Sequence, residues 1–112
     1  MTMTWNVVLH PDFQKEVLEL DKEVRTALFA RAKLLAEFGP SLGRPPVDTL
    51  TGSKHANMKE LRFDANNGVW RVAFAFDLER QAVLLVAGDK SGVSQKSFYQ
   101  KLIRKADKRF TD

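Results

Sequence analysis

Hydrophobic and polar side chains alternate through GVWRVAFAFD, Gly68 to Asp77, which is the pattern of a β-strand. Successive side chains of a strand point to opposite faces, so four bulky residues share one face: Trp70, Val72, Phe74 and Phe76. The other face carries Val69, Arg71, Ala73 and Ala75. One face is therefore bulky and apolar, and the other is small and holds a single charge, that of Arg71.

Two further strands flank this one. They are predicted at Met58 to Phe63 and at Ala82 to Ala87, separated from it by Asn66-Asn67-Gly68, a strong turn signal, and by a polar break at Asp77 to Arg80. The three strands form an antiparallel meander. AVLLVA, residues 82–87, is apolar on both faces, which predicts a central strand.

Helical periodicity appears on both sides of the meander. WNVVL, Trp5 to Leu9, is a short strand, after which Asp12 to Leu20 predicts one helix and a second, capped by Asp21, runs to Gly39-Pro40. The run from Gly39 to Ser53 is rich in Gly, Pro, Ser and Thr and predicts an irregular loop. Ser94 caps a last helix with a stripe of Phe98, Leu102 and Ala106.

These elements predict one α+β domain over residues 1–112: a small antiparallel sheet with an N-terminal helical hairpin and a C-terminal helix, in the order β-α-α-β-β-β-α. We expect the helices to pack against the bulky face and the face of Arg71 to stay open. Because Leu61 and Phe63 suit the core, Glu60 and Arg62 share this open face with Arg71, and Lys59 lies on the opposite one.

Composition narrows the class of protein. There are no cysteines, no apolar run near the ~20 residues that cross a bilayer, and no basic-then-apolar leader in MTMTWNVV. We therefore expect a cytoplasmic protein without a membrane partner.

The positive charge is concentrated at the C-terminus. Up to Asp89 there are 11 basic and 12 acidic residues, whereas from Lys90 onward there are 7 basic and 2 acidic. Clustered Lys and Arg favour polyanions such as RNA, although a solvated helix face has the same composition.

Several phrases resemble a known group: LTGSKHANMKELRF, the GVWRVAFAF strand and VLLVAGDKSG before a basic helix. Together with the order of elements, they are similar to the RelE/HigB superfamily of bacterial toxins, most closely its phage-derived HigB-type branch. The resemblance implies the toxin of a type II toxin–antitoxin system, a ribosome-dependent mRNA endonuclease inhibited by a cognate helix-turn-helix antitoxin. Operator DNA would be a partner only through the antitoxin.

The family's site residues transfer in part. Its arginine on the middle strand of the meander falls on Arg71, its basic residue after the central strand on Lys90, and its C-terminal aromatic residue on Tyr99, at a longer spacing from Lys90. Two family lysines on the first strand are replaced here by Met58 and Glu60.

RNA is cut when its 2′-hydroxyl attacks the adjacent phosphorus, which requires a base, an acid and cations but no cofactor. Arg71 and Arg62 are candidates for binding phosphate oxygens, Lys90 for neutralising charge or protonating the leaving oxygen, and Glu60 or His55 for the base. The predicted catalytic residues are Arg71, Lys90, Arg62, Glu60 and Tyr99. The predicted RNA-binding residues are Lys54, His55, Lys59, Lys96, Lys101, Arg104, Lys105 and Lys108.

Three alternatives remain open at this stage. Glu60 and Arg62, two apart on one strand, are also explained as structural partners of charges on a neighbouring strand, and for Glu60 this explanation is favoured. ParE-like toxins share the fold but inhibit DNA gyrase, and a basic helix also suits a nucleic-acid-binding module without catalysis.

Overall fold

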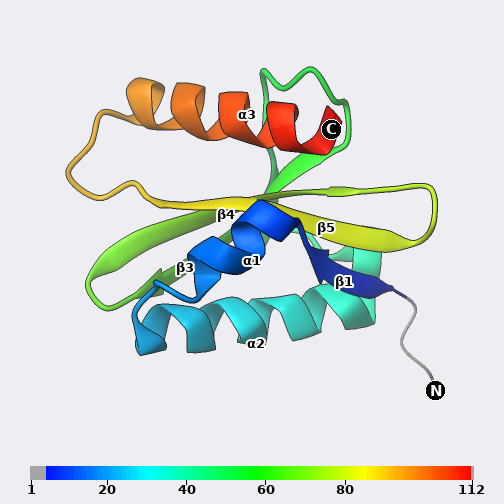
Figure 1. The fold of residues 1–112 in the computed structure, drawn as a ribbon, viewed down its shortest axis with the longest axis horizontal. Coiled ribbons are helices and arrows are strands. Elements are labelled where there is room, and N and C mark those ends of the chain that lie inside the picture. Colours follow the sequence, from blue (N-terminus) through cyan, green and yellow to red (C-terminus); the bar gives the residue numbers. More distant parts are fainter. Residues whose placement is uncertain (1–4, 112) are drawn as a thin grey trace.

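A computed structural model describes residues 5–111; Met1 to Thr4 and Asp112, at the ends of the predicted domain, lie outside the described residues. The chain forms one five-stranded sheet in the order β1-β5-β4-β3-β2, with helices on both faces (Figure 1). The strands are β1 (Asn6–Leu9), β2 (Val47–Thr49), β3 (Met58–Ala65), β4 (Gly68–Phe76) and β5 (Gln81–Asp89). The helices are α1 (Pro11–Val17), α2 (Lys22–Phe38), the short 3-10 helix η1 (Gly39–Ser41) and α3 (Gln95–Thr111).

The predicted meander β3-β4-β5 is confirmed. All three strands pair antiparallel, and Asn66 and Asn67 form the tight turn between β3 and β4 with φ of 51° and 63°. Asparagine tolerates this left-handed conformation, as a two-residue hairpin loop requires. The predicted α+β class is therefore correct, and the predicted order of helices and strands matches apart from one short additional strand and a short 3-10 helix.

Two details of the sheet differ from the prediction. β1 pairs with β5 in parallel, with Asn6 beside Gln81, so the sheet is mixed. The stretch expected to be wholly irregular contains β2, whose Val47 pairs with Leu61 and whose Asp48 pairs with Glu60. A strand of three residues is too short to produce a periodic signal, and the prolines before it resemble loop sequence.

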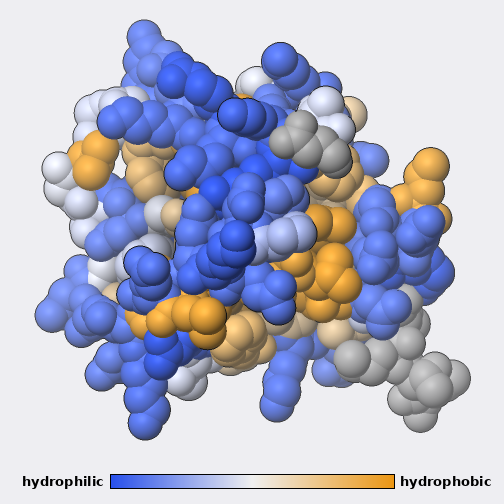
Figure 2. Space-filling model, viewed as in Figure 1, coloured by the Kyte–Doolittle hydropathy of each residue, from blue (hydrophilic) through white to orange (hydrophobic). Residues whose placement is uncertain are grey.

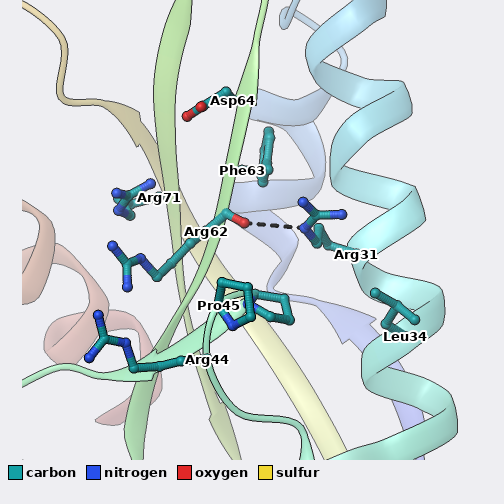
Figure 3. A pocket seen from close by; sticks show the side chains of 9 residues that line it. Arg31, Leu34, Arg44, Pro45, Arg62, Phe63, Asp64 and Arg71 are labelled. Atoms are coloured by element: carbon teal, nitrogen blue, oxygen red, sulfur yellow. Dashed lines mark hydrogen bonds between the residues drawn. The ribbon is translucent and has the colours of Figure 1, made fainter.

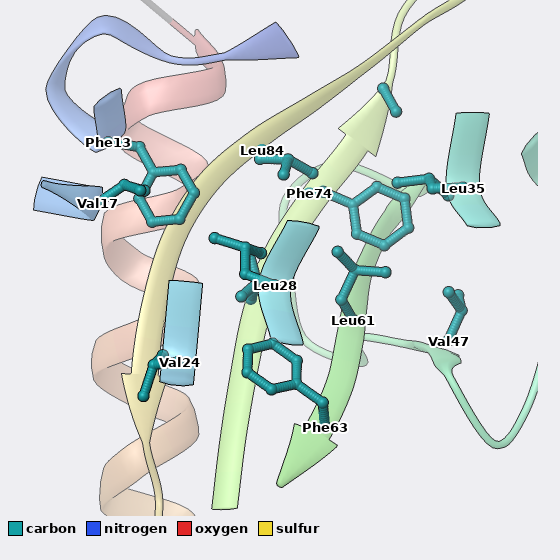
Figure 4. Packing of buried hydrophobic residues seen from close by; sticks show 12 residues of the cluster. Phe13, Val17, Val24, Leu28, Leu35, Val47, Leu61, Phe63, Phe74 and Leu84 are labelled. Atoms are coloured by element: carbon teal, nitrogen blue, oxygen red, sulfur yellow. The ribbon is translucent and has the colours of Figure 1, made fainter. Parts of the chain in front are cut away.

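The bulky face of the sheet packs against α1 and α2, as predicted (Figure 4). Phe13 and Val17 from α1 and Leu28 and Leu35 from α2 meet the strand side chains in one buried cluster. The strands contribute Val47, Leu61, Phe63, Val72, Phe74 and Leu84. This cluster is the larger of the two cores and fixes which face of β3 and β4 is turned away from α1 and α2.

The face of Arg71 is not open, which corrects the prediction. α3 crosses it and buries Phe98, Leu102 and Ala106 against Ala73, Ala75 and Leu85 (Figure 1). The alanines make room for a helix rather than for a ligand. At Gly88 an added Cβ would lie 2.8 Å from Phe98 Cε1, so α3 approaches β5 as closely as a glycine allows. Arg71 itself is only 6% exposed.

Two buried polar contacts that the sequence did not indicate hold α3 in place. The Asp107 carboxylate accepts hydrogen bonds from Ser53 Oγ and from the Lys54 backbone N–H, the latter at 2.9 Å. Arg109 Nη1 donates to Glu16 Oε1 at 2.9 Å and to the Leu85 carbonyl at 2.7 Å, and its Nη2 donates to Glu16 Oε2. These contacts tie α3 to the loop before β3, to α1 and to β5.

Replacing Arg109 by glutamine is expected to lower the free energy of unfolding by about 2 kcal/mol, because charge-assisted hydrogen bonds of a mostly buried side chain are lost. The hydrogen bonds of Arg109 lower the pKa of Glu16 below its ordinary value of 4.5. The stabilisation is therefore complete above about pH 4.5 and is lost as the pH falls through the lower pKa of the folded state. Urea unfolding at neutral pH and below pH 4 measures both effects, and R109Q should show the weaker acid dependence.

Candidate active site

The register of β3 and β4 places three charged side chains on the α3 side of the sheet. Arg62 is paired with Arg71, and Glu60 with Ala73, so Glu60, Arg62 and Arg71 share one face as the alternation predicted. Lys59 is paired with Phe74 and lies on the opposite face, so the structure separates it from these residues.

These three residues form a charged cluster beside α3. Glu60 Oε1 lies 3.8 Å from Arg71 Nε, and Glu60 Oε2 lies 4.0 Å from Arg62 Nε. Tyr99, on the first turns of α3, donates its hydroxyl hydrogen to Glu60 Oε1 at 2.8 Å. The Lys90 ammonium lies 5.6 Å from the centre of the Tyr99 ring, within cation–π range. We call Glu60, Arg62, Arg71, Lys90 and Tyr99 the Glu60 cluster.

The loop after β5 holds Lys90 in position. The Lys90 backbone N–H donates to the Val69 carbonyl at 2.8 Å, and the Asp89 carboxylate accepts from the backbone N–H groups of Val69 and Ser91. Burial opposes ionisation of Asp89, but the hydrogen bonds from Ser91 and Val69 outweigh it and lower the Asp89 pKa. Asp89 therefore stays ionised and fixes the turn that carries Lys90.

The environment shifts the pKa of three members of the Glu60 cluster. Burial raises the pKa of Glu60 above 4.5, although Tyr99, Arg71 and Arg62 oppose the change. Burial and the hydrogen bond to Glu60 raise the pKa of Tyr99, so its hydroxyl stays protonated. Burial and the charges of Arg71 and Arg62 lower the pKa of Lys90 below 10.5. The raised pKa makes Glu60 a stronger base than an isolated carboxylate, and the lowered pKa makes Lys90 a stronger acid than an isolated ammonium. These shifts suit a general base and a general acid.

A hollow of about 460 Å³ opens onto the Glu60 cluster. Glu60, Arg62, Lys90 and Tyr99 line it, whereas Arg71 lines the adjacent hollow. We call the first of these the cluster hollow. Its other walls are Arg44, Asp48, Thr49, Leu50, Thr51 and Gln95. The buried carboxylate and the ammonium therefore face a common space that a substrate can enter.

Asp48 and Arg44 also line the candidate site, and the sequence did not single them out. Asp48 Oδ2 lies 3.6 Å from Arg62 Nη1 and 3.7 Å from Arg44 Nε. Both residues come from the segment treated as an irregular loop, and only the pairing of β2 with β3 brings them here. Val47 and Thr49 are β-branched residues that favour a strand, and this was the one feature of the sequence that indicated β2.

The predicted RNA-binding residues separate into four places, one of which is the position of Lys59 on the opposite face of the sheet. Lys54, Lys96 and Arg104 line a hollow of about 570 Å³ that shares Tyr99 with the Glu60 cluster. Lys101, Lys105 and Lys108 line another, of about 550 Å³, together with Arg104. His55 lies at the far end of α3, where its ring packs against Phe110 and its Nε2 contacts Thr111 Oγ1 at 3.1 Å. Since Tyr99 and Thr111 are about 18 Å apart along a helix, His55 is outside the Glu60 cluster.

Figure 2, which has the same orientation as Figure 1, shows mostly hydrophilic side chains over the region of α3. In residues 5–111 there is no helix both long and apolar enough to span a bilayer. Within the same described range, His, Asp and Glu side chains form no group of three or more suited to a metal ion.

Comparisons with known proteins identify the family. Residues 15–111 match the family described as phage-derived protein Gp49-like. The chain is 45% identical over 94 residues to "Putative toxin HigB2" of Mycobacterium tuberculosis and 41% identical over 103 residues to "Putative toxin HigB3" of the same organism. These matches cover 83% and 92% of the chain; the chain spans 46% of the length of the first relative and 88% of the second.

Solved structures share the fold at low sequence identity. An arginine double mutant of the Escherichia coli toxin RelE in the free state aligns with a TM-score of 0.64 at 15% identity, covering 92% of this chain and 97% of that one. RelE in an archaeal RelE–RelB complex from Pyrococcus horikoshii aligns with a TM-score of 0.59 at 19% identity, covering 81% of this chain and 100% of that one. The resemblance seen in the sequence is thereby confirmed: the chain belongs to the phage-derived Gp49-like family within the RelE/HigB superfamily.

Proposed function

We propose that this protein is the toxin of a type II toxin–antitoxin system and acts as a ribosome-dependent mRNA endonuclease. The observation that carries the proposal is the Glu60 cluster, where a carboxyl of raised pKa and an ammonium of lowered pKa face one hollow beside two arginines. The names of the relatives HigB2 and HigB3, both called toxins, support the toxin assignment.

In the proposed reaction the Glu60 carboxylate takes the proton of the RNA 2′-hydroxyl. The freed oxygen attacks the adjacent phosphorus, and the bond from phosphorus to the 5′-oxygen breaks. Lys90 gives a proton to that leaving oxygen, so the products are a 2′,3′-cyclic phosphate and a 5′-hydroxyl. Arg62 and Arg71 stabilise the additional negative charge on the phosphorane oxygens. DNA lacks the attacking hydroxyl and is not a substrate.

Tyr99 has a positioning role in this scheme. Its hydroxyl hydrogen bond holds the Glu60 carboxylate, and its ring supports the Lys90 ammonium. This hydrogen bond uses one of the roughly four lone-pair positions of the carboxylate, so the substrate hydroxyl can still donate to it. Tyr99 thus fixes the relative positions of the base and the acid.

The proposed partner is a small helix-turn-helix antitoxin that inhibits the toxin. The RelE–RelB complex among the structural neighbours supports a protein partner of this kind. We expect an adjacent gene to encode it, and an isolated gene whose product is harmless on expression contradicts the toxin assignment.

The proposal is tested by translating a defined message in a cell-free extract with the purified protein and mapping the message by primer extension. New ends within translated codons, absent when translation is blocked, are the expected result. Intact message with loss of DNA supercoiling identifies a ParE-like gyrase inhibitor instead. Intact message with unchanged supercoiling, while the protein still binds RNA, identifies a non-catalytic binding module.

The basic side chains of α3 are expected to position the protein on ribosomal RNA. Replacing Lys101, Arg104, Lys105 and Lys108 by glutamine should weaken ribosome association at least about tenfold and flatten its salt dependence, because fewer counterions are released. All four side chains are exposed, so the fold should persist. Sedimentation with ribosomes at two salt concentrations measures the effect.

The control removes three positive charges away from α3, by replacing the exposed Lys15, Lys22 and Lys33 on α1 and α2 by glutamine. This variant should sediment with ribosomes like the unmodified protein. Equal losses in both variants would indicate that only net charge matters.

A further inference from the structure

A second hollow, also of about 460 Å³, lies next to the Glu60 cluster and is lined by four arginines (Figure 3). They are Arg31 from α2, Arg44 from the loop before β2, Arg62 from β3 and Arg71 from β4. Its single acidic lining residue is Asp64, and Leu34, Pro45, Pro46 and Phe63 form its apolar walls. We call it the arginine hollow. Arg44 and Arg62 line the cluster hollow as well, so the two hollows are adjacent.

The guanidinium groups in this region retain donors that no carboxylate has taken. Asp48 and Glu60 lie 3.6 to 4.0 Å from the nitrogens of Arg44, Arg62 and Arg71, beyond direct hydrogen-bond distance. Arg71 Nη1 donates to the Trp70 carbonyl at 2.8 Å, and the Arg71 Nε atom is buried beside Glu60 Oε1 without a hydrogen-bond partner. The donors that can meet a ligand in this hollow therefore belong chiefly to Arg31, Arg44 and Arg62.

The backbone holds the arginine hollow in a fixed shape. β2 pairs with β3 only as far as Leu61, and beyond it the Arg62 N–H donates to the Pro46 carbonyl at 2.8 Å. The Arg62 carbonyl accepts a hydrogen bond from Arg31 Nε at 3.2 Å, which anchors Arg31 at the edge of the strand (Figure 3). Because this bond uses only Nε, both terminal nitrogens of Arg31 remain available to a ligand.

We infer that the arginine hollow binds an RNA phosphodiester next to the scissile one. Planar guanidinium forks match the oxygens of a phosphate, and four of them around one space with a single carboxylate select a polyanion. Because the arginine hollow is adjacent to the cluster hollow, one RNA strand can place its reacting phosphate in the cluster hollow and a neighbouring phosphate here. That the bound polyanion is messenger RNA rests on the proposed function. That the arginine hollow binds phosphate rests on the arginines themselves. Arg31 and Arg44 are then positioning residues, not catalytic ones.

The test uses 2′-O-methyl RNA, which cannot be cut, in two lengths: a dinucleotide with one phosphodiester and a hexanucleotide. Fluorescence anisotropy gives the dissociation constant of each for the unmodified protein, R31Q, R44Q and K33Q. Lys33 lies on α2 like Arg31 and is exposed, so K33Q is a control with the same loss of charge. Arg44 is 73% exposed at the side chain and makes only a loose ion pair, so R44Q keeps the test valid if R31Q folds poorly.

R31Q and R44Q are each expected to bind the hexanucleotide about fivefold more weakly, with a salt slope smaller by about 0.7, the value for one single-strand phosphate contact. The affinity of R31Q for the dinucleotide, and that of K33Q for both probes, should not change. R44Q should weaken hexanucleotide binding more than dinucleotide binding, because Arg44 borders both hollows. Unchanged hexanucleotide binding overturns the inference, as does an equal loss for both probes, which would assign the arginines to the reacting phosphate. If inorganic phosphate alone abolishes the difference between the variants at millimolar concentration, the arginine hollow is a site for free phosphate.

The same proteins tested in the translation extract separate this inference from the proposed function. An unmodified protein that leaves the message intact refutes the nuclease, while the anisotropy still decides whether the arginine hollow binds RNA. If the nuclease is correct, R31Q should raise the message concentration needed for half-maximal cleavage and leave the maximal rate nearly unchanged.

Discussion

Arg71→Ala is expected to reduce message cleavage by about 10³-fold, the effect of removing a cationic or hydrogen-bond donor to a transition-state oxyanion. It should also lower the free energy of unfolding by about 3 kcal/mol, because the Glu60 carboxylate stays buried without its nearest cation on β4. On an open face, the same substitution would leave stability nearly intact, because an exposed charge contributes little to folding. The burial of Arg71 beneath α3 is the reason for the larger expected loss.

The pH dependence of R71A separates the two effects. Without Arg71 the pKa of Glu60, already raised by burial, rises further. A carboxyl whose pKa is raised in the folded state is most stabilising when protonated, so R71A should recover stability relative to the unmodified protein as the pH falls through that pKa. Urea unfolding of both proteins across the acid range measures this.

The double variant E60Q/R71A is the control. Its loss of stability should be smaller than the sum of the single losses, because removing both side chains leaves neither a buried carboxylate without its cation nor a buried guanidinium without its anion. Cleavage should stay absent. Additive stability losses would contradict a direct interaction between the two side chains. Full cleavage by a folded R71A would place the chemistry elsewhere.

Lys90→Gln is expected to reduce the maximal cleavage rate by about 100-fold, within the usual contribution of a general acid. Because burial and the charges of Arg71 and Arg62 lower the Lys90 pKa, the unmodified protein should lose activity on the alkaline side at a pH below the ordinary lysine value of 10.5. K90Q should lack that decline. Single-turnover cleavage rates across the alkaline range test both expectations.

Lys90→Arg tests what the ammonium does. Arginine keeps the positive charge but does not release a proton at accessible pH. If Lys90 protonates the leaving oxygen, K90R is as impaired as K90Q. If K90R retains most of the activity, Lys90 only neutralises charge and another group is the acid.

The alternation of side chains made much of this site predictable. It placed Glu60, Arg62 and Arg71 on one face, and the turn at Asn66 and Asn67 set their register. The packing on this face was not predictable in the same way, because Ala73 and Ala75 are compatible with an exposed face and with one covered by a helix. That α3 covers it depends on contacts with Phe98, Leu102 and Ala106, which are distant in the sequence. Asp48 was missed because a three-residue strand has no period.

Parallel pairing of β1 with β5 places Asn6 beside Gln81, so the sheet cannot close until nearly the whole chain is available. Contacts between residues so distant in sequence slow folding, because the entropy of loop closure is lost before the contacts stabilise the structure. The Glu60 cluster is completed later still, by Lys90 and by Tyr99 on α3. A growing chain therefore carries Glu60, Arg62 and Arg71 without the residues that complete the cluster, and the ribosome synthesising this protein is not exposed to its proposed activity until synthesis reaches α3.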